Sequence, residues 1–90
     1  MSISKLMELM EAVVKIEYET PASATINIGR DKSVLIRLYG IENLRKRTPD
    51  MVFAIMRTDP RGDERLEEII SKVKAWRQMV EDSMKDMELQ

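Results

Sequence analysis

The stretch that decides the fold is "LEEIISKVKAWRQMVEDSMKDM", residues 66–87. Its apolar residues recur at spacings of three and four, which is the period of one face of an α-helix. Opposite charges stand four residues apart on the other face, as in Glu68 and Lys72. The pattern predicts a long amphipathic helix over residues 63–88. Such a helix spans roughly 37 Å at 1.5 Å per residue, so its C-terminal half is expected to project beyond a domain of this size.

The length and composition limit how the chain can be stabilised. Ninety residues are enough for a single domain, here 1–90, and at this size folding buries only about 60–65% of the surface of the unfolded chain. The chain has no cysteine and no histidine, which excludes disulfides and Cys/His metal sites. Stability must therefore come from a well-packed core, from oligomerisation or from both.

The first half of the chain reads as a helix followed by strands. Residues 2–11 have apolar side chains at helical spacing, and from residue 14 the period changes to the two-residue alternation of a strand. The segments 14–19, 24–28 and 33–39 each alternate and are separated by turn residues. They predict a three-stranded antiparallel meander with one face packed on helices.

The region after the third alternating segment has two interpretations. A short helix is expected at 41–47, and Thr48 followed by Pro49 has the chemistry of a helix start, which predicts a second short helix at 49–57. The competing interpretation is that the wholly apolar run 51–56 forms a fourth, buried strand. The predicted fold class is thus α+β: an N-terminal helix, a three-stranded antiparallel meander, a short helix or fourth strand, and a long C-terminal amphipathic helix.

The projecting part of the last helix is the first candidate for a functional surface. Its apolar side chains would need a second chain to cover them, which predicts a homodimer seam or a docking face for a protein partner. The alternative is that the helix lies flat on the sheet and buries its stripe within one chain. The residues expected at the interface are Val73, Trp76, Met79, Val80, Met84 and Met87.

The charge distribution is the second candidate. The whole chain has a net charge of −1, but residues 30–47 carry six basic and two acidic groups. This surplus predicts contact with an anionic partner, either nucleic acid or an acidic protein surface. The alternative is that the last three cations only compensate the C-terminal dipole of a short helix. The candidate contact residues are Arg30, Lys32, Arg37, Tyr39, Arg45, Lys46 and Arg47.

The residue types available for catalysis argue against an enzyme. Without histidine or cysteine the commonest general base and the best nucleophile are missing, and the nearest carboxylate pair, Glu17 and Glu19, is expected on a solvated face. We therefore expect no cofactor, no metal and no small-molecule substrate.

The sequence also predicts where the protein works. No apolar run approaches the roughly 20 residues of a membrane span, and Glu8 and Glu11 interrupt the N-terminal apolar residues, unlike a secretion signal. A cytoplasmic location without membrane contact is expected. The predicted function is a non-enzymatic interaction or regulatory module that self-associates through its C-terminal helix; the alternative is a small nucleic-acid-binding protein that uses residues 30–47.

Overall fold

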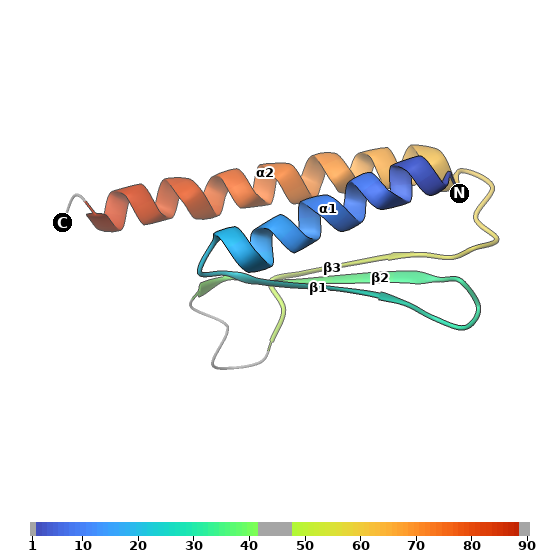
Figure 1. Ribbon diagram of the computed structural model, residues 1–90, viewed down its shortest axis with the longest axis horizontal. Helices are drawn as coiled ribbons and strands as arrows, with labels where there is room; N and C mark the ends of the chain where they lie inside the picture. Colours follow the sequence, from blue (N-terminus) through green and yellow to red (C-terminus); the bar gives the residue numbers. More distant parts are fainter. Residues whose placement is uncertain (1, 42–47, 89–90) are drawn as a thin grey trace.

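The computed structural model of the chain describes residues 2–41 and 48–88. The three strands form one antiparallel sheet in the order β1-β2-β3, and both helices cover the same face of it (Figure 1). The elements are α1 (Ile3–Glu19), β1 (Ser23–Ile28), β2 (Val34–Tyr39), β3 (Met51–Ile55) and α2 (Gly62–Glu88). This arrangement confirms the predicted α+β class, with an N-terminal helix, a three-stranded antiparallel sheet and a long C-terminal helix.

Helix α1 continues through residues 14–19, so the prediction of a first strand there is wrong. Val13 and Ile16 are three residues apart and buried, whereas Val14 and Tyr18 are four apart and exposed. The helix thus has apolar side chains on two faces, and where the two sets interleave the sequence imitates the alternation of a strand.

Local chemistry ends α1 at the junction with β1. Pro21 disfavours helical geometry at Thr20, which is extended (φ −130°, ψ 160°). The carbonyl of Ile16 accepts both the hydroxyl of Thr20 at 2.7 Å and its backbone N–H at 3.2 Å, which holds Thr20 against the last turn of the helix. The Glu17 carboxylate accepts the backbone N–H of Ala24 at 2.8 Å and so fixes the start of β1 against the helix.

The apolar run after Pro49 is strand β3, so the strand interpretation is right and the predicted helix at 49–57 is wrong. The strand is not buried as expected: it lies at the edge of the sheet, and Val52 and Ala54 are exposed. Its residue Phe53 pairs with Ile36 of β2, on the face that the helices cover. Instead of opening a helix, Asp50 lies just before the strand, and its N–H donates to the carbonyl of Leu38 at 2.8 Å. Pairing with β2 therefore prevails over the local helix-start signal. The short helix predicted at 41–47 falls, apart from its first residue, outside the described residues.

The hydrophobic core lies between the sheet and the two helices. Central strand β2 alternates strictly, with Val34, Ile36 and Leu38 buried and the residues between them half-buried. On α2, Leu66 and Val73 have no exposed surface. Among the residues that the structure describes, no helix lies over the opposite face of the sheet (Figure 1).

The two helices run side by side in the same direction (Figure 1). Parallel helix dipoles repel each other, and ion pairs across the junction offset this. The pairs are Lys5 with Glu67, Lys74 with Glu8 (3.4 Å) and Arg77 with Glu19 (2.7 Å). Hydrogen bonds to Glu81 and Glu19 raise the pKa of Arg77 above its ordinary value. Each exposed pair contributes only about 0–1 kcal/mol, so packing remains the main source of helix–helix stability.

The register of β2 predicts different costs for two adjacent truncations. Ile36→Ala should lower the free energy of unfolding by about 2–5 kcal/mol, because Ile36 is fully buried. Leu35→Ala should cost clearly less, because Leu35 lies on the open face of the sheet. Urea unfolding followed by far-UV circular dichroism measures both. A larger loss for Leu35→Ala would mean that the strand is shifted by one residue.

Candidate interaction surfaces

The predicted seam on α2 is largely occupied by the chain's own core. Val73, Trp76 and Val80 are buried against the sheet and α1, and Met84 packs partly against the same cluster. Covering these side chains requires no second chain. Met79 is 67% exposed, and the side chain of Met87 lies outside the described part of the structure. The last turns of α2 extend past the end of α1 (Figure 1).

The predicted basic patch is divided by the length of β2. Arg30 and Lys32 lie in the turn before this strand, whereas Tyr39 is its last residue. Lys32 and Tyr39 are seven positions apart along extended chain, roughly 23 Å at 3.3 Å per residue. Arg37 and Tyr39 share the open face of the sheet and are half-buried there. The run Arg45, Lys46 and Arg47 lies outside the described residues.

The β1–β2 turn presents its cations to solvent. Lys32 has φ 66°, and its N–H donates to the carbonyl of Gly29 at 2.9 Å. The Asp31 carboxylate accepts the hydroxyl of Ser33 at 2.7 Å and its backbone N–H at 3.0 Å. These hydrogen bonds lower the pKa of Asp31, and the bond from the Ser33 hydroxyl has the largest effect. Arg30 and Lys32 form no ion pair with any other described residue.

Removing the hydroxyl of this turn should change the titration of Asp31. Ser33→Ala is expected to raise the pKa of Asp31 toward its ordinary value, because the first cause of its lowering is gone. A lowered folded pKa stabilises the fold above the unfolded pKa, and this stabilisation is lost as the pH falls through the folded pKa. The stability difference between wild type and variant should therefore shrink on acidification.

Carboxyl ¹³C NMR titration of Asp31 measures this change. Ser71→Ala, at an exposed position of α2, is the matched control and should leave the Asp31 titration as in wild type. If the pKa of Asp31 is identical in wild type and Ser33→Ala, the hydrogen bond from the Ser33 hydroxyl is not the main cause of the lowered pKa.

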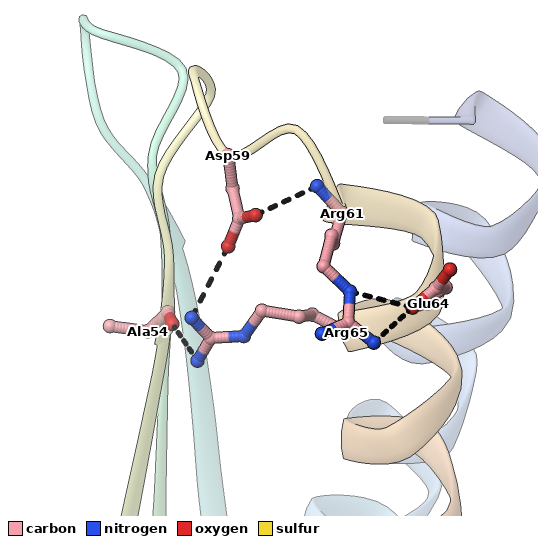
Figure 2. Close-up of polar contacts among 5 residues, drawn as sticks. All are labelled: Ala54, Asp59, Arg61, Glu64 and Arg65. Atoms are coloured by element: carbon pink, nitrogen blue, oxygen red, sulfur yellow. Dashed lines mark hydrogen bonds and ion pairs between the residues drawn. The ribbon is translucent and has the colours of Figure 1, made fainter.

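The charged residues at the start of α2 hold the loop that leads into it (Figure 2). The Asp59 carboxylate accepts the backbone N–H of Arg61 at 2.8 Å and the guanidinium of Arg65 at 3.2 Å. Arg65 also donates to the carbonyl of Ala54 at 3.3 Å, and Arg61 pairs with Glu64. Arg65 thereby ties the helix to edge strand β3 and occupies a carbonyl that an added strand would need. These charges have a structural explanation within one chain.

A groove of about 360 Å³ runs between α1 and α2. Its lining is mostly charged, but the cations already have partners: Lys15 with Glu11 at 3.1 Å, Lys74 with Glu8 and Arg77 with Glu19. A ligand there would have to compete with these ion pairs. The groove therefore offers no ready site for a charged small molecule.

The most distinctive surface of the molecule is an apolar stripe on α1 that faces neither the sheet nor α2. We call it the α1 outer stripe. It consists of Ile3 (76% exposed), Met7 (63%), Met10 (37%), Val14 (46%) and Tyr18 (84%). Successive members stand three or four residues apart, so they lie on one side of the helix. Monomeric proteins seldom expose contiguous apolar surface of this kind without a function.

Sequence reasoning missed this surface because it merged two stripes into one. The helical spacing within residues 2–11 alone places Ile3, Met7 and Met10 on the same apolar face as Leu6. In the structure Leu6 packs against the core while the others are exposed. The signal was present: residues 3, 7, 10 and 14 and residues 6, 9, 13 and 16 form two separate series, each with helical spacing.

No protein-family model, curated protein or solved structure was found to be significantly similar to this chain. Among the described residues, neither helix has the length and apolar character needed to cross a membrane.

Proposed function

We propose that this chain is a non-enzymatic protein-interaction module that self-associates, and that the contact surface is the α1 outer stripe rather than α2. The observation that supports this is the exposure of five large apolar side chains along a single helix face. Burying them against a second chain would remove apolar surface from water, which is the main driving force of most protein association.

The size of the stripe is suited to a dimer. Five side chains of this kind, exposed by 37% to 84%, present on the order of 500 Å² of apolar surface. A standard stable interface buries about 800 Å² per partner, of which somewhat more than half is apolar. The stripe with a polar rim therefore reaches the area that a stable dimer needs. Two of its members are methionines, whose flexible side chains adapt to an apolar partner surface.

A homodimer formed this way leaves other surfaces free for further partners. The open face of the sheet, with Leu35, Arg37 and Tyr39, lies on the side away from the helices. Each dimer would present this face twice, which suits a scaffolding or regulatory role in which avidity matters. No catalytic residue is proposed, because the carboxylates of the inter-helix groove are engaged in ion pairs.

The alternative function is binding of nucleic acid through residues 30–47. It is supported by the exposed cations Arg30 and Lys32, which have no ion-pair partner among the described residues. A double variant with both changed to alanine should then weaken DNA or RNA binding in a low-salt gel-shift assay. Absence of any shift with the wild-type chain at low ionic strength would exclude this alternative.

Matched substitutions on the two helices separate the proposed contact from the predicted seam on α2. Met7→Lys should weaken the dimer at least about tenfold, because a desolvated charge in an apolar contact costs more than about 1.4 kcal/mol. Met79→Lys, at a position of nearly equal exposure on α2, should leave the dimer intact. Sedimentation equilibrium over a dilution series measures both. Each variant should keep the stability of the folded monomer within about 0.5 kcal/mol, since both sites are exposed.

Two results would contradict the proposal. Dissociation caused by Met79→Lys but not by Met7→Lys would move the seam to α2. A wild-type chain that stays monomeric at every concentration would exclude self-association.

A further inference from the structure

The α1 outer stripe has the spacing of a coiled-coil seam. Ile3 and Met10 are seven residues apart, as are Met7 and Val14, so the four occupy the two alternating seam positions of the heptad pattern. Their spacing of four, three and four is the same when read in either direction. A second copy of α1 laid in the opposite direction therefore presents the same series.

We propose that α1 of a second copy packs antiparallel on this stripe about a two-fold axis, with Ile3 opposite Val14 and Met7 opposite Met10. This inference rests on the proposed self-association and specifies its geometry. The two-fold operation generates each contact twice, as expected for an isologous dimer. All four seam residues then have an apolar partner.

Charge favours this direction over a parallel pair. Glu17 follows Met10 by seven residues and so occupies the next seam position. A parallel pair would place the two Glu17 residues side by side, and like charges at such positions are destabilising. An antiparallel pair keeps them at opposite ends of the paired helices, where each carboxylate keeps its hydrogen bonds to Ser23 and Ala24 of its own chain.

The rest of the fold leaves room for this partner. Lys5, Glu8 and Glu19 mark the side of α1 that meets α2 through ion pairs. Leu9 and Ile16 mark the side that is buried on the core. The outer stripe lies on neither side, so a second α1 can approach without displacing α2 or the sheet. Tyr18, the most exposed member, would extend over the first turn of the partner helix.

Single-cysteine variants test the direction, because the chain has no cysteine of its own. In the antiparallel pair Ile3→Cys of one copy faces Val14→Cys of the other. A mixture of the two variants in a glutathione redox buffer should give the mixed disulfide as the main cross-linked product. Each variant alone should give little, because equivalent residues lie roughly 16 Å apart along the helix axis, whereas a disulfide needs Cα atoms within about 7 Å.

Ser83→Cys, at an exposed position of α2, is the control for disulfides formed by random collision. The mixture should give at least about tenfold more disulfide than this control. Circular dichroism checks that each variant is folded. Efficient disulfides from Ile3→Cys alone and Val14→Cys alone would show a parallel pair and overturn this inference while leaving self-association intact. No product above the control, with a wild-type chain that sediments as a dimer, would also overturn it. A wild-type chain that sediments as a monomer would instead remove the proposed function itself.

Discussion

The structure depends on covering one face of a three-stranded sheet with two helices. A sheet of this size has no stability of its own in water unless an apolar face is packed against another layer. Here Val34, Ile36 and Leu38 of the central strand supply that face, and α1 and α2 together cover it. Because α2 contributes buried residues from Leu66 to Val80, its apolar stripe is mostly used in folding.

The two helices differ in how much of their apolar surface the core buries. α1 buries Leu9, Val13 and Ile16 in the core and still exposes a second series of apolar side chains. A helix that only covered the sheet would be expected to have a polar outer face. The second face of α1 is the basis of the proposed self-association, and the symmetry of its spacing is compatible with a copy of the same chain.

The sequence predicted the parts of this fold in which local and tertiary preferences agree. The long helix α2 and strands β1 and β2 could be predicted because their periods are unambiguous. The segments 14–19 and 49–57 could not: the first belongs to a helix with two apolar faces, and in the second, pairing with β2 outweighs the helix-start chemistry of Thr48 and Pro49. The candidate surface on α2 was a reasonable expectation from amphipathicity, but periodicity cannot say which chain covers a stripe.

Methionine methyl groups provide the most direct test of the claim that the α1 outer stripe is covered by a second copy. In a chain labelled at the methionine methyls, NMR can follow protection from a soluble paramagnetic agent as the protein concentration is raised. If a second copy covers the stripe, the Met7 and Met10 methyls become protected with increasing concentration, whereas the Met79 methyl stays accessible. Protection of Met79 with Met7 and Met10 unchanged, or no change at any of the three, would contradict it.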